Sequence, residues 1–557
     1  MNTSNRISNF YLTNRVSVNF TLSLIPLFLF ACGGNKSSKL TDSLKIGYPF
    51  DYVPPSKDYQ QPLNLDPYSR ILETQYVDPY WIGALEKVST KQSVSELLIS
   101  NDRIFIFSFP TEKPSYLPVS ISGWLPANES IKLASRDIFS KLEKILDLTF
   151  VESGAPDGLN VLAVSQSIQS NSSGLSYYPN NFYEIGSDIF ISRDYSNPEY
   201  ISSELTNYDY EVLVHEIGHA LGLKHPFETD RDDELILNIK EDQTLYTAMS
   251  YTDYTYTFDG TFRALDWMAL TKLYGVNPKY REENDTYNFS KSSGIFIIDG
   301  AGIDTISAPT TTQDVSVDLR MGSHSHLGNK AIYISEPNQM TISHGSKIEN
   351  VVTGFGDDLI IGNELDNEIK TSSGDDQIFA GEGSDRIISG AGADLIDLSE
   401  EVSFVDEVIV FIDDVYSSFD KVYGFMQGND GDVINFQDIF ETDLTLLPLI
   451  DLSNVPNGNI SDCIVTIVGN GLEDSISISN NFQNGMVLEK LSLSVNQSAL
   501  MVSAASQSTG EDQNIFLLNN RNDDLDVFHV MHFAGNYLDI DSWTSHNFFT
   551  SESNLIV

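Results

Sequence analysis

Between residues 96 and 275 the chain alternates short apolar runs with segments of helical periodicity. Residues 129–147 predict an amphipathic helix, because their apolar positions recur at spacings of three or four. A second helix is predicted from near Asp209, and four apolar runs predict strands. This alternation indicates an α/β or α+β domain. The four runs are RIFIFSFP from Arg103, LTFV at 148–151, LNVLAV at 159–164 and SDIFIS at 187–192.

A different rhythm begins at Thr353, where a nine-residue period runs five times without a slip. Its sixth position is always Asp or Asn and its eighth is always isoleucine, a phasing that a Gly/Asp-rich surface loop would not keep. Glycines favour tight turns, the isoleucines can fill a thin core, and the aspartates offer oxygen ligands to a hard cation. These positions are Asp358, Asn367, Asp376, Asp385, Asp394 and Ile360, Ile369, Ile378, Ile387, Ile396.

The first 32 residues have the layout of an export signal. Arg6 and Arg15 lie in an acid-free start, and an apolar stretch follows that closes on small residues. The sequence LFACG at 29–33 resembles a bacterial lipobox, which implies cleavage before Cys32 and a lipid on its sulfur. A plain signal peptide and an uncleaved anchor are the alternatives.

Two other stretches carry no motif that assigns them a role. Residues 33–95 are rich in Pro, Tyr, Asp and Ser, which predicts a linker or a propeptide. Residues 441–557 are acidic and predict a β-rich C-terminal region. Residues 554–557 resemble the apolar end of type I secretion substrates, but we favour the N-terminal signal because its composition is clearer.

The charge balance excludes one class of partner. The 557 residues carry 79 acids against 32 bases, a net charge of −47. Phosphate backbones require a basic footprint, so we expect no nucleic-acid partner. Such an acidic excess keeps a surface solvated or presents carboxylates to cations. The two cysteines, Cys32 and Cys463, exclude a disulfide framework and a zinc site of four thiolates.

The segment HEIGHALGLKHP at 215–226 concentrates the residues that could carry chemistry. His215 and His219 stand four apart, so both imidazoles project from one helix face and can bind one zinc ion. Glu216 lies where its carboxylate can reach a water at the metal. Gly222 lets the chain leave the helix sharply, which brings in His225 as a third ligand.

HExxHxxGxxH followed by a Met-turn is the metzincin signature, and the Met-turn here is AMSY at 248–251. The final His-Pro and the MSY sequence resemble the serralysin branch of the metzincins. This resemblance implies that Tyr251 is an additional zinc ligand that leaves the metal to hydrogen-bond the oxyanion. It implies that Met249 is structural, and that Glu216 is the general base of metal-assisted peptide hydrolysis. It also places a substrate-binding edge strand at 171–179, for which an ordinary surface strand is the alternative.

The nonapeptides resemble the GGxGxDxUx repeat of calcium-binding RTX proteins, which implies a parallel β-roll that folds as it binds several calcium ions. The phrase DGAGID at 299–304 and Glu349 resemble serralysin calcium positions that precede the repeats. The second repeat lacks two glycines, so we expect fewer or weaker ions there. The implied calcium positions are Asp299, Asp304, Glu349, Gly354, Gly356, Asp358, Asn367, Gly374, Asp376, Gly381, Gly383, Asp385, Gly390, Gly392 and Asp394.

The sequence therefore predicts a multidomain chain: a metzincin α/β zinc-protease domain at 96–275, an RTX β-roll domain at 276–440 and a β-rich region at 441–557. We expect a secreted or surface-tethered bacterial endopeptidase, monomeric and acting on proteins or peptides, with one zinc ion and several calcium ions. The segment 33–95 could keep such an enzyme latent until it is removed. The alternative is a calcium-dependent surface adhesin or scaffold with an inactive protease domain. The complete set of three histidines, Glu216 and Tyr251 favours the enzyme.

Overall fold

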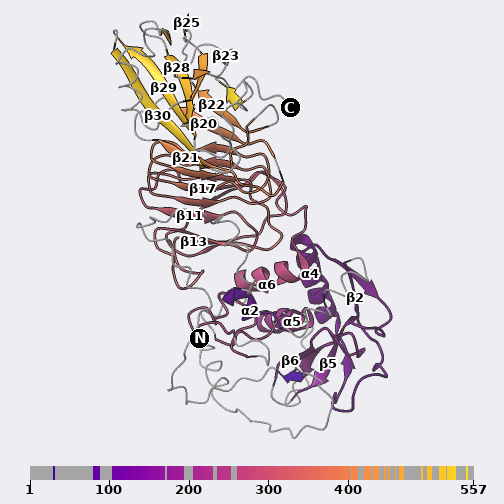
Figure 1. Cartoon of the computed structure of the whole chain (residues 1–557). Helices are drawn as coiled ribbons and strands as arrows, with labels where there is room; N and C mark the ends of the chain where they lie inside the picture. The colour runs from indigo at the N-terminus through magenta and orange to yellow at the C-terminus, as the bar shows by residue number, and fades with distance from the viewer. Residues whose placement is uncertain are drawn as a thin grey trace. The chain divides into compact units, whose positions relative to one another are not determined.

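The computed structural model describes the two ends of the chain only in part. The chain divides into two compact units, Met1–Tyr280 and Arg281–Val557 (Figure 1). None of the described helices is long and apolar enough to cross a membrane. The described residues are 29–31, 79–87, 94, 103–169, 172–193, 205–229, 235–252, 260–402, 404–411, 419–427, 431–437 and, after these, separate strands and Asn547.

A largely parallel sheet forms one side of the first unit. Its order is β1-β6-β7-β5-β2-β4, with β3 beside β5. Strands β4, β2, β5 and β7 are parallel, whereas β6 runs antiparallel to β7 and β1 antiparallel to β6. The four strands predicted from the apolar runs are confirmed as β2, β4, β5 and β7. The bounds are β1 Leu29–Ala31, β2 Ile104–Ser108, β3 Leu125–Pro126, β4 Thr149–Ser153, β5 Leu162–Ile168, β6 Gly174–Tyr177 and β7 Ile189–Arg193.

Helix α4 (Glu129–Ile145) covers this sheet and confirms the predicted amphipathic helix. The Asn128 side chain caps its start by accepting a hydrogen bond from the backbone N–H of Ile131 at 2.9 Å. Phe139 packs on the rings of Phe107 and Phe150, with centroids 4.6 and 4.8 Å away. The helix ends two residues earlier than predicted, because the backbone turns extended immediately after it to enter β4.

Helix α5 (Asn207–Ala220) confirms the second predicted helix and carries the HExxH segment. A capping box between Thr206 and Asp209 fixes its first turn. Helix α6 (Ala264–Tyr274) packs nearby, and its Tyr274 hydroxyl donates to the carbonyl of Leu221 at 2.6 Å. This bond holds the end of α5, where the chain turns toward His225.

Residues 79–87 lie within the stretch for which the sequence predicts a linker or propeptide, and they are packed into the first unit. They include helix α2 (Tyr80–Gly83), and Ile82 and Leu85 are buried. The backbone N–H of Lys87 donates to Gly222, and that of Lys224 donates to Leu85. The apolar run WIGAL explains the difference, because it supplies a buried face that a free linker lacks.

The second unit is a roll of two facing sheets whose strands are visited alternately as the chain advances (Figure 1). One sheet has the order β31-β22-β20-β18-β16-β14-β10-β8, and all its pairs are parallel. The other sheet runs in parallel from β15 to β21. The strands of the roll are β8 Thr286–Asn288, β9 Ile295–Ile297, β10 Thr305–Ser307, β11 Val315–Asp318, β12 His324–Leu327, β13 Gln339–Ile342, β14 Asn350–Val352, β15 Leu359–Ile361, β16 Glu368–Lys370, β17 Gln377–Phe379, β18 Arg386–Ile388, β19 Leu395–Asp397, β20 Glu407–Phe411, β21 Asp420–Tyr423 and β22 Val433–Gln437.

The repeat isoleucines form the core between the two sheets, as the nine-residue period predicts. Within one sheet Ile360 pairs with Ile378 and Ile378 with Ile396, and in the other Ile369 pairs with Ile387. All five are 0% exposed. Each repeat strand contributes one isoleucine to this core, so the roll depends on stacking many such layers.

Most of the described strands after residue 440 continue the same two sheets, whereas β25 and β27 pair only with each other. Strand β30 lies parallel beside β21, and β31 lies parallel beside β22. The boundary predicted at residue 441 therefore falls within continuous sheets. The remaining strands are β23 Thr445–Leu446, β24 Ile450–Asp451, β25 Gly458–Asn459, β26 Cys463–Val468, β27 Leu491–Ser492, β28 Ser498–Ala504, β29 Gln513–Arg521, β30 Asp524–Ala534 and β31 Phe548–Phe549.

Replacing one core isoleucine should destabilise the roll measurably. We expect Ile378→Ala to lower the free energy of unfolding by about 2–5 kcal/mol, because it leaves a cavity between two stacked layers. Urea unfolding in saturating calcium measures the change. Ile332→Ala, at a side chain that is 64% exposed, is the control, and equal losses in the two variants would contradict the stacked core.

Candidate metal centres

The last two turns of α5 bring His215 and His219 to one buried face. The Nδ1 atom of His215 lies 2.7 Å from the carbonyl of Ala248, and Nδ1 of His219 lies 2.7 Å from that of Leu223. A carbonyl oxygen only accepts, so each Nδ1 carries the proton and each Nε2 presents a lone pair.

Gly222 turns the chain out of the helix, as its position in the motif predicts. Its φ is +101°, in the region that a residue with a Cβ rarely adopts. The reversal returns His225 to the helix face, with its Nε2 atom 3.2 Å from Nε2 of His215 and 3.1 Å from Nε2 of His219.

These three nitrogens fit a tetrahedral metal ion. Zinc–nitrogen bonds of 2.0–2.1 Å place neighbouring ligand nitrogens about 3.3 Å apart, close to the spacing found here. Among the described residues, these three imidazoles form a group of possible metal ligands, and their ligand atoms all lie within 4.8 Å of one another. Because at least two of the Nε2 atoms are acceptors, a cation is the partner that satisfies the group.

Burial keeps two of these histidines neutral. It lowers the pKa of His215 to about 3 and that of His219 well below its ordinary value, and the neighbouring His225 adds to both effects. Neutral imidazole is the form that binds a metal ion.

The predicted Met-turn lies beneath this group. Met249 is fully buried, and its sulfur packs so closely under Gly218 that a Cβ there would lie 2.6 Å away. Asp266 of α6 anchors the turn by accepting from the Thr247 hydroxyl at 2.6 Å and the Ala248 N–H at 2.7 Å. The hydroxyl of Tyr251 then lies 2.8 Å from Nε2 of His225. The structure therefore brings Tyr251 to the three histidines.

Glu216 is fully buried beside the histidines and packs against β6. A Cβ on Gly174 would lie 2.4 Å from Oε1 of Glu216. Only glycine at the start of β6 allows the carboxylate this position. Sequence reasoning missed Gly174. Glycine is required there because of a contact with Glu216, which lies 42 residues later in the sequence, and no local pattern reveals such a contact.

A second residue missed from the sequence is Glu228. Its Oε1 atom lies 2.9 Å from Nδ1 of His225, the nitrogen that faces away from the other imidazoles. A carboxylate at this place orients an imidazole and raises its basicity as a ligand. The signal available in the sequence was an acid three positions after the last histidine of the motif.

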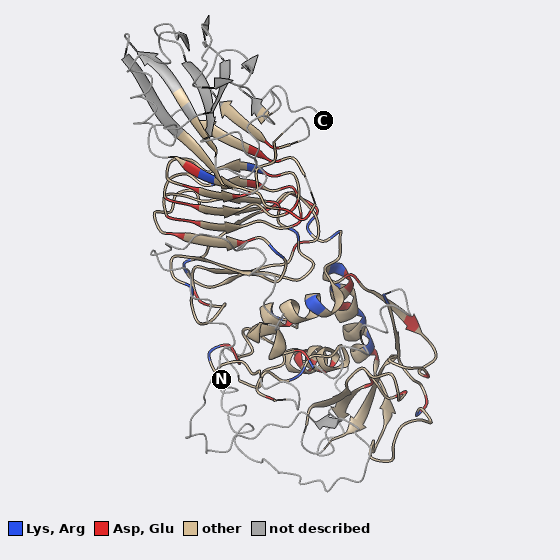
Figure 2. Ribbon diagram, in the orientation of Figure 1, with Lys and Arg blue, Asp and Glu red and all other residues tan. Residues whose placement is uncertain are grey.

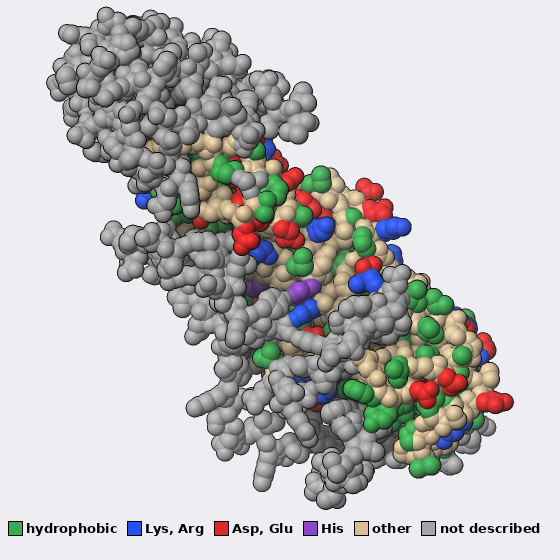
Figure 3. Space-filling model, turned by 45° about the vertical axis from the view of Figure 1, so that its right-hand side comes forward, with side chains coloured by type: hydrophobic (Ala, Val, Ile, Leu, Met, Phe, Trp, Pro, Cys, Tyr) green, Lys and Arg blue, Asp and Glu red, His purple; other side chains and the backbone are tan. Residues whose placement is uncertain are grey.

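In the roll, the predicted aspartates stack in two columns at the turns before the strands. Each accepts, through Oδ1, the backbone N–H of the column member 18 residues earlier: Asp376 from Asp358 at 2.8 Å, and Asp394 from Asp376 at 2.9 Å. In the opposite column Asp385 accepts from Asn367 at 2.7 Å. Figure 2 shows acidic residues in rows along the roll, and on the face drawn in Figure 3 acidic side chains gather over its described part.

The turns carrying these columns approach one another so closely that glycine is required at several predicted positions. A Cβ on Gly392 would lie 1.8 Å from the carbonyl oxygen of Gly374, and one on Gly381 would lie 2.3 Å from that of Asn363. At the second repeat Asn367 differs from its neighbours, because its amide donates to the Glu349 carbonyl at 3.0 Å. An amide that donates in place of a carboxylate lowers the negative charge of that turn.

The positions predicted ahead of the repeats also converge. Glu349 accepts from the N–H of Asp304 at 2.8 Å, and Asp304 accepts from that of Asp285 at 2.7 Å. Asp299 is fully buried and accepts from the Tyr287 hydroxyl. These acids continue the column that contains Asn367. Cys32 lies outside the described residues.

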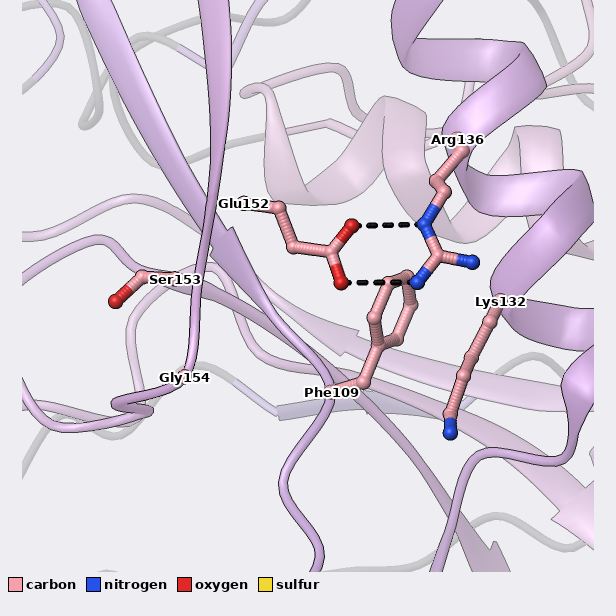
Figure 4. Close-up of a pocket in the computed structure, with 6 residues that line it drawn as sticks. All are labelled: Phe109, Lys132, Arg136, Glu152, Ser153 and Gly154. Atoms are coloured by element: carbon pink, nitrogen blue, oxygen red, sulfur yellow. Dashed lines mark hydrogen bonds and ion pairs between the residues drawn. The ribbon is translucent and has the colours of Figure 1, made fainter.

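A surface pocket of about 360 Å³ lies elsewhere in the first unit, between α4 and β4. Figure 4 shows Arg136 and Glu152 facing one another beside Phe109, with two hydrogen bonds of 2.7 and 2.9 Å. The guanidinium carbon lies 4.9 Å from the ring centroid of Phe109. Each charge in this pair is neutralised by the other, so the pocket offers no reactive group comparable to the histidine site.

Comparisons with known proteins identify a repeat family and several relatives. The family described as the RTX calcium-binding nonapeptide repeat matches residues 361–396. A serralysin of Proteus mirabilis is 29% identical over 303 residues, covering 47% of this chain and 60% of that protein. Serralysin G of Dickeya chrysanthemi is 28% identical over 286 residues, covering 46% and 58%.

A third relative, metalloprotease AprA of Pseudomonas entomophila (strain L48), is 32% identical over 197 residues, covering 29% of this chain and 39% of that protein. The chain thus spans less than two thirds of the length of each of these relatives. It is similar to the serralysins and carries RTX repeats, which confirms the resemblance read from HExxHxxGxxH and the nonapeptides.

Without calcium, the roll should lose stability as the pH rises. Burial, with help from neighbouring carboxylates, raises the pKa of Asp358 to about 6, Asp376 to about 7 and Asp385 to about 9. Between an ordinary pKa near 4 and these values the folded chain binds more protons than the unfolded chain, so stability is full at low pH and falls as these protons are lost. In a calcium chelator we expect a higher urea midpoint at pH 5 than at pH 8.

Saturating calcium should reverse this order, since the ion binds the deprotonated carboxylates. Far-ultraviolet circular dichroism of the full chain at both pH values follows the transition. If the urea midpoints in the chelator were the same at pH 5 and pH 8, the raised pKa values of the buried aspartates would be contradicted.

Proposed function

We propose that this chain is a zinc-dependent, calcium-stabilised endopeptidase of the serralysin type, with a metzincin arrangement in its first unit and an RTX roll in its second. The observation that carries the proposal is the approach of the Nε2 atoms of His215 and His219 to within 3.2 and 3.1 Å of Nε2 of His225, beside a fully buried carboxylate. Residues His215, His219, His225 and Tyr251 would hold the zinc ion. When bound, zinc would polarise a peptide carbonyl and make a water more acidic.

Glu216 acts as the general base in this proposal. Its carboxylate takes a proton from the attacking water as the carbon–oxygen bond forms, and then gives that proton to the amine nitrogen as the carbon–nitrogen bond breaks. The same proton is used twice, so no further acid is required. The buried, closely packed position against Gly174 holds the carboxylate for both transfers.

Tyr251 acts as a donor to the oxyanion. Its hydroxyl lies beside His225 and is partly exposed, so it can turn from the imidazole group toward a substrate carbonyl. A phenol that donates where negative charge develops stabilises the transition state more than the ground state.

We propose that the edge of β6 binds the substrate backbone. Strand β6 includes Gly174, which contacts Glu216, so a peptide along this edge passes the carboxylate. Strand β1 pairs antiparallel with this edge, with Leu29 opposite Tyr177 and Ala31 opposite Leu175. This pairing supports the proposal, because it is an extended segment added to the edge by backbone pairing.

The remaining expectations stay proposals. We propose an extracellular or cell-surface location, export through residues 1–32 and a lipid tether on Cys32. We propose protein or peptide substrates, no nucleic-acid partner and a monomer. Residues 1–32, 33–95, 96–275, 276–440 and 441–557 remain the proposed division of the chain, with the packed residues 79–87 assigned to the catalytic unit.

The decisive test is Glu216→Gln, which keeps the size of the side chain and removes its basicity. We expect hydrolysis of a quenched peptide to fall by about a hundredfold to ten-thousandfold, with zinc retained at the wild-type level. Zinc content is measured by plasma mass spectrometry on the same samples.

Glu112→Gln changes an exposed glutamate of the same unit and should leave hydrolysis unchanged. Wild-type chain that binds zinc and hydrolyses nothing, even after residues 33–78 are removed, would favour the adhesin alternative. An active Glu216→Gln variant would remove Glu216 from the mechanism.

Gly174→Ala tests the close packing of Glu216. The added methyl should displace the carboxylate and lower kcat by about tenfold to a hundredfold, with zinc content unchanged because the three atoms nearest to that methyl all belong to Glu216. Gly154→Ala, at a position with nothing within 4 Å, is the matched control. Equal kcat values in the two variants would show that the contact does not position Glu216.

A further inference from the structure

The column of aspartates that contains Asp385 continues past the last nonapeptide. Asp406, which precedes β20, accepts the N–H of Asp385 through Oδ1 at 2.8 Å. Asp432, which precedes β22, accepts the N–H of Asp406 through Oδ1 at 3.0 Å. The spacing grows from 18 residues to 21 and then to 26, so the nine-residue period is lost while the column persists.

Asp385 and Asp406 each have a carboxylate oxygen that no described residue satisfies with a hydrogen bond. Asp385 is 2% exposed and Asp406 is 0% exposed, and Oδ2 of each accepts no hydrogen bond from the described residues. Asp432 differs, because its Oδ2 accepts the N–H of Met426 at 2.6 Å. A buried carboxylate oxygen without a donor is costly, so the first two positions call for a cation and the third does not.

Glu400 adds a third carboxylate at the same place. Its Oε2 accepts the N–H of Phe404 at 2.9 Å, and its carboxyl group lies within hydrogen-bonding reach of the carboxyl group of Asp406. Two ionised carboxylates are both acceptors and cannot bond to one another. A cation between them, or a proton held on one of them, is therefore required.

The charged neighbours of this group supply no counter-ion. Apart from these two carboxylates themselves, the charged residues that raise their pKa values are Asp366, Glu382 and Asp432, and all three are acids. Arg386 lies on the neighbouring strand, but its guanidinium bonds to Glu368 and Glu407. The described residues thus leave the negative charge at Glu400 and Asp406 for a bound cation to neutralise.

We propose that Asp385 of the fourth nonapeptide forms a calcium site with Glu400 and Asp406, which lie beyond the repeats. In the repeats, glycine turns bring backbone carbonyls toward the aspartates. Here the loop at 399–405 has no glycine, and the side chain of Glu400 supplies the oxygen ligand. Calcium accepts several carboxylate oxygens in irregular geometry, whereas magnesium demands a near-ideal octahedron. This site would tie the loop to the turn of the fourth repeat, independently of any protease activity.

The test is the number of calcium ions bound by the full chain, measured by equilibrium dialysis with radioactive calcium. We expect Glu400→Gln to bind one ion fewer than wild type, or to bind that ion at least tenfold more weakly. Glu401→Gln, the adjacent exposed glutamate, is the matched control and should bind the wild-type number. Wild-type number and affinity in Glu400→Gln would overturn the site.

A second variant tests whether the two carboxylates share one ion. Asp406→Asn keeps the Oδ1 acceptor for the Asp385 N–H and should lose the same single ion, and the double variant should lose no more than one. Loss of two ions in the double variant would overturn a shared site. Should Asp406→Asn lose its β-type circular dichroism, Glu400→Gln decides, because Glu400 is partly exposed. Magnesium at equal concentration should not displace the ion, and displacement would overturn the assignment to calcium.

Discussion

The crowding of buried hydrogen-bond acceptors is the constraint on which this structure depends. In the first unit, His215 and His219 donate from Nδ1 to backbone carbonyls and direct their Nε2 atoms toward Nε2 of His225. In the roll, each repeat aspartate accepts a backbone N–H through Oδ1, and its Oδ2 atom is buried without a hydrogen bond from the described residues. Neither arrangement is stable in a dry interior on its own, because acceptors cannot bond to acceptors. A bound cation would supply the positive charge that these crowded acceptors need, and the fold of each unit positions them as ligands.

The two kinds of acceptor select different ions. Imidazole nitrogens at a tetrahedral spacing suit zinc, whereas stacked carboxylates and turn carbonyls suit calcium. The sites also differ in what holds them. Packing of α5, α6 and the Met-turn positions the histidines through bonds such as that from Tyr274 to Leu221. The columns are positioned mainly by the turns they themselves stabilise, so we expect the folding of the roll to be coupled to calcium binding.

Local sequence patterns predicted the parts of this arrangement that arise from short stretches of chain. The spacing from His215 to His225, and the positive φ of Gly222, follow from one helical segment and its exit. The buried isoleucines follow from a strict period, in which one layer predicts the next. The amphipathic helix α4 follows from its own apolar stripe. Residues 79–87 were missed because their burial depends on pairing with residues 222–224, far along the chain.

The residues that sequence reasoning missed share a physical cause. Gly174 is required by the carboxylate of Glu216, and Glu228 acquires its place from the turn that follows His225. Asp406 was missed because the period breaks before it, although an acid followed by a hydrophobic residue two positions later recurs there. The hydrogen bond from Asp385 shows why the column survives the break: a strand needs an acceptor for the N–H at its entry, whatever the length of the turn before it. Register in the sheet, and not the repeat length, is therefore what fixes these acidic positions, and the column reaches Asp432 at the start of β22.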